Sequence, residues 1–286
     1  MKITEIISGD APSLSFEVFP PKTSDKFESV MGAAAEIAKL KPSYMSVTYG
    51  AGGGTSEYTT AICEALNSFG VTALAHLTCV SSNRGRIESE LEKLRSHGIG
   101  NILALRGDIP GGFDRESAHY RHASELMKEI ADFGGFCIGG ACYPEGHPES
   151  ANSADDIEGI QRKVDAGCEF LTTQMFFDNN ILYNFLYRLY RAGIDVPVVA
   201  GVMPVTSAAQ IKRLCSISSS ALPQRFIRIV DRYGDDSAAM KQAGIAFATE
   251  QIIDLYANGI NAVHVYSMNK PDVAAAIKAN LSEIVK

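Results

Sequence analysis

Three kinds of segment are missing from this sequence, and each absence excludes a class of protein. No stretch of about 18 consecutive apolar residues occurs, so we expect no membrane span. No long basic run occurs and the net charge is -7, so nucleic-acid binding is not expected as the main role. Residues 1–10 lack a basic stretch followed by an apolar one, which indicates no signal peptide.

The cysteines also lack a pattern that would indicate a structural site. The six cysteines form no Cys-x-x-Cys pair and lie mostly within apolar runs. They indicate buried, reduced thiols in a cytoplasmic protein, not a disulfide framework or a zinc site. Glu145 and His147 could contribute to a metal site, but no further ligands are evident nearby. We therefore expect no metal.

The bulk composition is that of a globular protein. The chain has 286 residues, of which 46% are hydrophobic and 21% are charged. This length suffices for one large α/β domain or two small ones. No change in composition suggests a linker, so we expect one domain over residues 1–286.

One unit recurs along the chain: an amphipathic helix, a glycine, and then an apolar run. A glycine after a helix commonly takes the left-handed conformation and lets the chain turn into a strand. The glycines in question are Gly70, Gly98, Gly134, Gly167, Gly193 and Gly259. The predicted strands are 14–19, 43–48, 72–79, 101–105, 136–141, 169–174, 197–202 and 262–266. The predicted helices are 25–39, 55–69, 84–97, 119–133, 154–166, 180–192, 206–217, 237–257 and 271–284.

This alternation favours a (β/α)₈ TIM barrel with extra helix between strands seven and eight. The structural alternative is an open, doubly wound sheet. Such a sheet usually has fewer strands, and its first turn often reads G-x-G-x-x-G, where this chain has Phe19-Pro20-Pro21-Lys22.

The first predicted strand carries a carboxylate, Glu17, between apolar residues. Alternation places Ser15, Glu17 and Phe19 on one face and Phe16 and Val18 on the other. A buried carboxylate is costly unless it is paired or neutral. Glu17 is therefore either a strand-end residue that meets solvent or an arginine, or an acid whose pKa is raised by burial.

Polar residues gather where the predicted strands end, which is where a barrel of this kind has its active site. Several acids, two histidines, a glutamine and glycine-rich loops indicate a site for a large polar ligand. Some have simpler explanations: His76 could be a core histidine, Arg106 could pair with Asp108, and Arg162 and Lys163 could be a solvated helix face. The glycines at 52–54 cradle phosphate only if their amides converge at a helix start.

A series of motifs resembles the methylenetetrahydrofolate reductase family, in the same order and over nearly the whole chain. Any one motif is weak, but together they are highly specific. They are Ser15-Phe16-Glu17-Val18-Phe19-Pro20-Pro21-Lys22, Ser46-Val47-Thr48-Tyr49-Gly50-Ala51, His76-Leu77-Thr78-Cys79, Leu103-Ala104-Leu105-Arg106-Gly107-Asp108, Tyr143-Pro144-Glu145-Gly146-His147-Pro148, Lys163-Val164-Asp165-Ala166-Gly167, Thr173-Gln174-Met175-Phe176-Phe177-Asp178 and Gly201-Val202-Met203-Pro204-Val205.

The resemblance implies an FAD-dependent barrel of one-carbon metabolism. NAD(P)H would reduce FAD, and the reduced flavin would then convert 5,10-methylenetetrahydrofolate to 5-methyltetrahydrofolate by ping-pong hydride transfer. Two alternatives stay open: the same barrel taking electrons from an iron–sulfur partner subunit, or a non-catalytic binding subunit. We also expect a homo-oligomer.

The resemblance carries over roles residue by residue. Glu17 corresponds to the general acid, and Asp108 to a catalytic carboxylate beside the flavin and the pterin. Substrate-binding positions are Asp108, Gln174, Gln210 and Lys270. FAD-binding positions are Thr48, His76, Arg106, Gly107, Asp108, Ala123, Ala141, Tyr143, His147, Asp156, Arg162 and Lys163. The chain departs from the family pattern at His122, Gly159 and Leu214.

Overall fold

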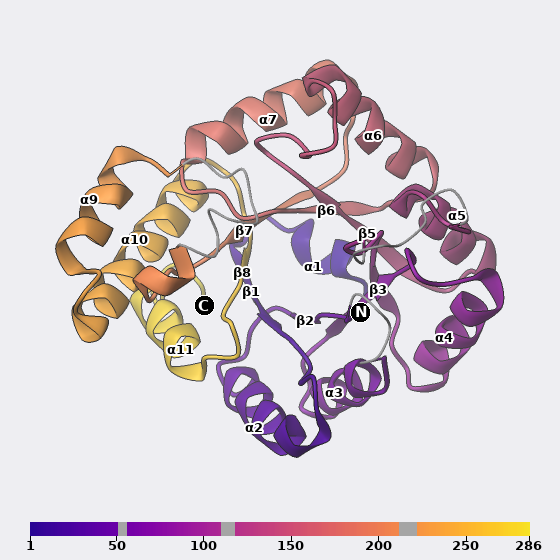
Figure 1. Cartoon of the computed structure of the whole chain (residues 1–286), viewed down its shortest axis with the longest axis horizontal. Coiled ribbons are helices and arrows are strands. Elements are labelled where there is room, and N and C mark those ends of the chain that lie inside the picture. The colour runs from indigo at the N-terminus through magenta and orange to yellow at the C-terminus, as the bar shows by residue number, and fades with distance from the viewer. Residues whose placement is uncertain (51–55, 110–117, 212–221) are drawn as a thin grey trace.

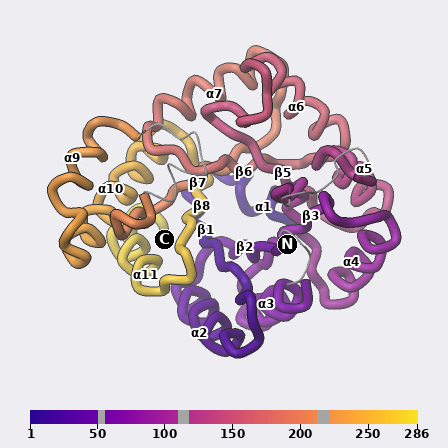
Figure 2. The backbone as a smooth tube through the Cα atoms, viewed as in Figure 1, coloured from indigo at the N-terminus to yellow at the C-terminus, as the bar shows by residue number. Residues whose placement is uncertain are grey.

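Eight parallel strands close into a barrel that is surrounded by helices. The computed structural model describes residues 1–50, 56–109, 118–211 and 222–286. Each strand pairs with the next along the chain, and β8 pairs with β1. Figures 1 and 2 show the helices as a ring around the barrel. The predicted (β/α)₈ barrel is therefore confirmed.

The strands lie where the hydrophobic pattern predicts them. All eight observed strands begin and end within two residues of the predicted ranges. They are β1 (Ser13–Val18), β2 (Met45–Val47), β3 (Ala73–Thr78), β4 (Asn101–Leu105), β5 (Cys137–Cys142), β6 (Phe170–Thr173), β7 (Val198–Val202) and β8 (Ala262–Val265). The six glycines that precede strands all have a positive φ, between 69° and 100°, as expected.

The helices follow the predicted order as well. They are α2 (Phe27–Ala38), α3 (Ser56–Ser68), α4 (Arg84–Ser96), α5 (Ala123–Phe133), α6 (Ser153–Asp165), α7 (Asn179–Arg191), α9 (Gln224–Tyr233), α10 (Ser237–Ala257) and α11 (Pro271–Asn280). Both α9 and α10 lie between β7 and β8, so the extra helix predicted there is confirmed. Half of the helix predicted over 206–217, residues 212–217, falls outside the described residues. Within the described ranges, no helix combines the length and apolarity that a membrane span needs.

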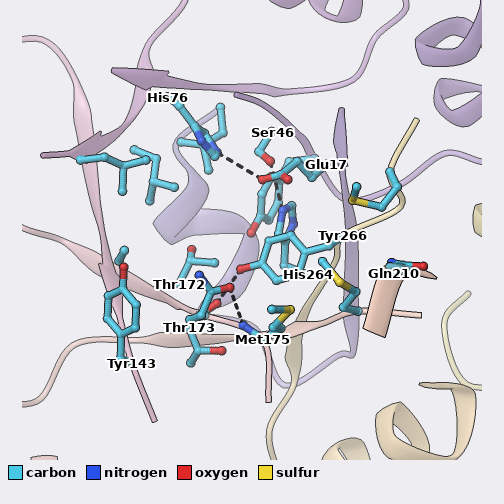
Figure 3. Close-up of a pocket in the computed structure, with 18 residues that line it drawn as sticks. Glu17, Ser46, His76, Tyr143, Thr172, Thr173, Met175, Gln210, His264 and Tyr266 are labelled. Atoms are coloured by element: carbon cyan, nitrogen blue, oxygen red, sulfur yellow. Dashed lines mark hydrogen bonds and ion pairs between the residues drawn. The ribbon is translucent and has the colours of Figure 1, made fainter. Parts of the chain in front are cut away.

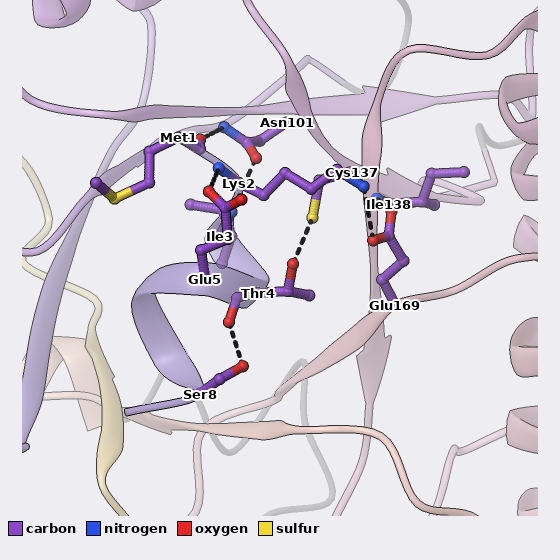
Figure 4. A network of polar contacts seen from close by, with 10 residues as sticks. All are labelled: Met1, Lys2, Ile3, Thr4, Glu5, Ser8, Asn101, Cys137, Ile138 and Glu169. Carbon is purple, nitrogen blue, oxygen red and sulfur yellow. Dashed lines mark hydrogen bonds and ion pairs between the residues drawn. The ribbon is translucent and has the colours of Figure 1, made fainter. Parts of the chain in front are cut away.

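The short helix α1 (Ile3–Ile7) was not predicted, because five residues carry too little periodic signal. It closes one end of the barrel: Ile3 and Ile7 pack in one cluster with Leu74, Leu103 and Phe170. Polar contacts hold α1 in place (Figure 4). The side chain of Asn101 accepts from the Ile3 amide at 3.0 Å, and Lys2 Nζ lies 3.2 Å from Glu169 Oε2. This end of the barrel is therefore filled with packed side chains.

The barrel interior is tightly filled beside β5. Gly139 is paired in register with Phe170 on β6. A Cβ atom at Gly139 would lie 2.3 Å from Cζ of the Phe170 ring, which is closer than any real contact. Phe170 is fully buried, so its ring has no room to move away. Glycine at 139 is therefore required by the ring opposite it.

We expect Gly139→Ala to lower the free energy of unfolding by about 1–3 kcal/mol, the usual cost of overpacking a core. Gly32→Ala is the matched control, because Gly32 lies in α2 and a Cβ there would meet nothing within 4 Å. That variant should gain about 0.5–1 kcal/mol from helix propensity. Urea unfolding of both variants measures the difference. A Gly139→Ala protein as stable as the wild type would contradict the packing argument.

Candidate functional site

Two adjoining pockets, each of about 360 Å³, lie toward the carboxyl ends of the strands. The first, here called the central pocket, is drawn in Figure 3 and contains Glu17, His76, Thr172 and Tyr266 in its lining. The second, here called the lateral pocket, lies over β4, β5 and α6. Leu105, Ala141 and Tyr143 line both, so one extended ligand can occupy the two together.

Glu17 projects from β1 into the central pocket, on the face that the alternation predicted. The side chain is 15% exposed, and this part faces the pocket. Burial raises the pKa of the Glu17 carboxyl from 4.5 to about 8, because a charged carboxylate is poorly solvated there. At neutral pH Glu17 therefore holds a proton and is equipped to act as an acid.

The nearest basic group to this acid is also neutral. His76 Nε2 lies 3.8 Å from Glu17 Oε2, which is beyond hydrogen-bond distance. Burial lowers the pKa of His76 to about 4, so its imidazole carries no charge at pH 7. An imidazolium at this distance would favour ionised Glu17. The neutral imidazole leaves the proton on the acid.

A second buried histidine, His264 on β8, is held by two serines. Ser15 Oγ donates to the Val263 carbonyl, so it accepts from His264 Nδ1 at 2.8 Å. His264 Nε2 then accepts from Ser46 Oγ at 3.0 Å. Burial lowers the pKa of His264 to about 3, and Tyr44 stacks on its ring. The network fixes a neutral tautomer and leaves both ring nitrogens satisfied.

The end of β1 is tied to the segment after β8, which fixes the backbone around Glu17. Asn269 bonds both backbone groups of Phe19: its Oδ1 accepts from the amide at 2.9 Å, and its Nδ2 donates to the carbonyl at 2.8 Å. Ser267 Oγ donates to the Glu17 carbonyl at 2.7 Å. Asn269 makes these bonds from a left-handed conformation with φ of 53°, which asparagine tolerates. This clamp limits movement of the acid.

Three of the four predicted substrate-binding residues, all except Asp108, lie on the β6–β8 side of the barrel. Gln174 follows β6 and lines the central pocket, and its Oε1 accepts from the Met175 amide at 2.9 Å. Gln210 also lines this pocket, and its Oε1 accepts from the Thr206 amide at 3.1 Å. Lys270 Nζ donates to Thr206 Oγ1 at 2.8 Å. Gln210 and Lys270 thus converge on one residue.

The lateral pocket contains three cationic side chains alongside four acids, Asp108, Glu149, Asp155 and Asp156. Arg106, Arg162 and Lys163 all line it. Lys163 donates to the Ala141 carbonyl at 2.7 Å, and burial lowers its pKa. Such a set of cationic donors suits a phosphate or diphosphate group. The lateral pocket therefore has the chemistry to hold the phosphate part of a dinucleotide.

The lateral pocket also contains a buried acid, Asp156 on α6, which is 6% exposed. Its Oδ1 accepts from the His147 amide at 3.1 Å and from Ser150 Oγ at 3.4 Å. Its Oδ2 is buried and has no hydrogen-bond partner within the described ranges. A carboxylate oxygen in this state can accept from a ligand hydroxyl, such as that of a ribose.

Most of the predicted FAD-binding residues lie together. The lateral pocket is lined by Arg106, Gly107, Asp108, Ala123, Ala141, Tyr143, His147, Asp156, Arg162 and Lys163, and also by His122 and Gly159. His76 lies in the central pocket instead. Thr48 lines neither pocket, and its amide bonds the Val18 carbonyl at 3.0 Å. Leu214 and the glycines at 52–54 lie outside the described residues.

Two of the simpler explanations that the sequence offered for charged residues are wrong. Arg106 does not take Asp108 as its partner: its guanidinium binds Glu149 with two hydrogen bonds, of 2.6 and 3.0 Å. Asp108 is exposed at the lateral pocket and does not line the central one. Lys163 is not part of a solvated helix face, because it is half-buried against β5, whereas Arg162 is exposed.

Sequence reasoning assigned no role to several polar residues that line the central pocket, among them Ser46, Thr172, His264 and Tyr266. His264 and Tyr266 could be seen as polar residues near a strand end, but nothing distinguished them from core residues. The signal that could have found them is the alternation of side chains along a strand. Residues two apart share a face, so Ser46 shares a face with Tyr44, Thr172 with Gln174, and His264 with Tyr266.

The raised pKa of Glu17 predicts how stability depends on pH. Between its ordinary value of 4.5 and about 8, the folded protein keeps a proton that the unfolded chain has lost. The contribution of protonated Glu17 to the free energy of unfolding is therefore fully present at low pH and is lost as the pH rises toward about 8. We expect the unfolding free energy of the wild type, minus that of Glu17→Gln, to fall by up to about 1.4 kcal/mol per unit from about pH 5 to pH 8.

The control is Glu250→Gln. Arg225 holds the pKa of Glu250 below its usual range, so this acid is ionised in both states across the same window. The difference in unfolding free energy between the wild type and Glu250→Gln should therefore stay constant over this pH range. Urea unfolding at several pH values measures both. A flat difference for Glu17→Gln as well would show that Glu17 is ionised in the folded protein at neutral pH.

Comparisons with known proteins identify the family. Residues 2–282 match the family model described as methylenetetrahydrofolate reductase. The chain is 33% identical over 266 residues to 5,10-methylenetetrahydrofolate reductase of Escherichia coli, with 93% of this chain and 89% of that protein covered. It is 32% identical to methylenetetrahydrofolate reductase (NADH) 1 of Arabidopsis thaliana, covering 99% of this chain and 50% of that protein.

The fold also matches solved structures. A protein from Clostridium thermocellum, described as binding two copies of 5-methyl-5,6,7,8-tetrahydrofolic acid, aligns with a TM-score of 0.63 and 15% identity, with 99% of each chain covered. At that identity the likeness shows the fold alone. The family model and the relatives, in contrast, cover almost all of this chain. The chain belongs to the methylenetetrahydrofolate reductase family.

Proposed function

We propose that this protein reduces 5,10-methylenetetrahydrofolate to 5-methyltetrahydrofolate, with NAD(P)H as electron donor and FAD as cofactor. Family membership supports the reaction. The observation that carries the proposal is the burial of the Glu17 carboxyl in the central pocket, which raises its pKa to about 8. The reaction needs an acid there, because a carbon–nitrogen bond of the substrate must open.

The residues of the two pockets fit FAD. Arg106, Arg162 and Lys163 supply positive charge for the diphosphate, and the free oxygen of Asp156 is suited to a ribose hydroxyl. The shared wall of Leu105, Ala141 and Tyr143 leads from this charged pocket into the more apolar central one. When bound, FAD supplies hydride transfer from NAD(P)H to the methylene carbon of the folate.

Glu17 performs the proton step. When the five-membered ring of the substrate opens, the bonding electron pair goes to N10 and a carbon–nitrogen double bond forms at N5. N10 takes its proton from Glu17, which becomes a carboxylate. A carboxylate in this pocket has a high proton affinity, so the acid recovers a proton before the next turnover. The neutral state of His76, 3.8 Å away, keeps the acid in its protonated form.

The other predicted residues bind the folate and polarise its pterin ring. Gln174, Gln210 and Lys270 are assigned to the folate, and their side chains converge on the β6–β8 side of the barrel. The family resemblance assigns Asp108 to the edge where the cofactor ring and the pterin meet, and its side chain lies exposed at the lateral pocket. A negative charge there disfavours a second negative charge on the reduced cofactor and helps to bind the pterin.

An anaerobic titration of the purified protein tests the proposal. The protein should be yellow, NADH or NADPH alone should bleach the flavin absorbance, and methylenetetrahydrofolate should then restore it. Titrating the two nicotinamides separately establishes which donor is used. A flavin that neither nicotinamide bleaches would point to a partner subunit as electron source. A colourless, active protein would exclude FAD.

A further inference from the structure

One pocket-lining side chain has a polar atom that neither the fold nor the proposed roles use. Thr172 lies on β6 and is 6% exposed. Its hydroxyl oxygen is buried and makes no hydrogen bond within the described part of the chain. Four other such atoms lie in the two pockets, on Tyr44, His76, Gln210 and Asp156. The proposed function assigns Gln210 and Asp156 to ligands, and His76 is among the predicted FAD-binding residues. Tyr44 stacks on the ring of His264, and Thr172 is the other residue of this kind without an assigned ligand.

The neighbouring threonine shows what a structural hydroxyl on this strand looks like. Thr173 Oγ1 accepts from the Gly201 amide at 2.8 Å, and so joins β6 to β7. Thr172 has no such bond, and a valine of the same shape would fill its place without a buried polar atom. A hydroxyl kept there destabilises the empty protein unless a ligand bonds it.

The location of Thr172 indicates which part of a ligand it meets. Its register partner on β5 is Ala141, which belongs to the wall shared by the two pockets. Gln174 lies two residues further along the same face. Figure 3 shows Thr172 among the side chains that surround the central pocket. A ring that enters the central pocket from the lateral one therefore passes Thr172.

The side chain can present its hydroxyl without movement of the backbone. Rotation about χ1 exchanges the positions of the hydroxyl and methyl groups, which are similar in size. The hydroxyl can donate one hydrogen bond and accept others, so it suits a ring edge that carries both N–H and C=O groups.

We infer that the Thr172 hydroxyl is a ligand-binding group that hydrogen-bonds the N–H and C=O edge of a fused nitrogen heterocycle in the central pocket. The flavin of FAD and the pterin of the folate share this edge chemistry. The inference rests on the proposed function, since it takes its two ligands from there.

The test uses Thr172→Val, which removes only the hydroxyl, and Thr172→Ser, which keeps it. FAD is titrated into each flavin-free protein and followed by flavin fluorescence. 5-Methyltetrahydrofolate is then titrated into each FAD-loaded protein. We expect Thr172→Val to bind one of the two ligands about tenfold more weakly, which is about 1.4 kcal/mol, and Thr172→Ser to bind as the wild type does. The weakened ligand identifies the ring.

Urea unfolding of the flavin-free proteins separates this role from a structural one. Thr172→Val should be at least as stable as the wild type, because it loses a buried, unpaired hydroxyl. Thr173→Val is the matched control and should be less stable, because it leaves the Gly201 amide unpaired. A destabilised Thr172→Val protein would overturn the inference.

The remaining outcomes are also distinct. If Thr172→Val binds FAD and 5-methyltetrahydrofolate as tightly as the wild type does, the inference is overturned and the proposed function stands. A wild type that binds neither FAD nor the folate would overturn the proposed function, and this inference with it.

Discussion

Removal of the Glu17 carboxyl from bulk water is the constraint on which the site depends. Burial raises the pKa of Glu17 and lowers those of His76 and His264, so three ionisable groups that face the barrel interior are all neutral at pH 7. Each would be costly to bury as an ion. Because the surrounding fold disfavours charge, it stores a proton on the acid instead of forming an ion pair with a histidine.

The rest of the barrel makes this arrangement stable. At one end, α1 and the ring of Phe170 fill the interior with apolar packing, and Gly139 leaves room for that ring. At the other end, His264 donates to Ser15 and accepts from Ser46, and Asn269 holds the end of β1. The apolar end supplies stability, while the polar end keeps donors and acceptors free for ligands.

The sequence predicted the fold better than the details of the site. Apolar runs, six of them preceded by a glycine, located all eight strands, but the five residues of α1 were too few to recognise. The motifs located many residues of the two pockets, because most of the motifs lie at or just after a strand end. They did not indicate that Arg106 would pair with Glu149, that Thr48 would line neither pocket, or that Thr172 would lack a partner. Those features depend on side-chain contacts between elements distant in the sequence.

The most direct test of the central claim compares the two half-reactions of Glu17→Gln by anaerobic stopped-flow absorbance. If Glu17 donates a proton to the folate, reduction of the flavin by NAD(P)H should keep nearly its wild-type rate. Reoxidation by methylenetetrahydrofolate should fall by about 10² or more, the usual scale for loss of a general acid. Equal losses in both half-reactions, or no loss in either, would contradict the account.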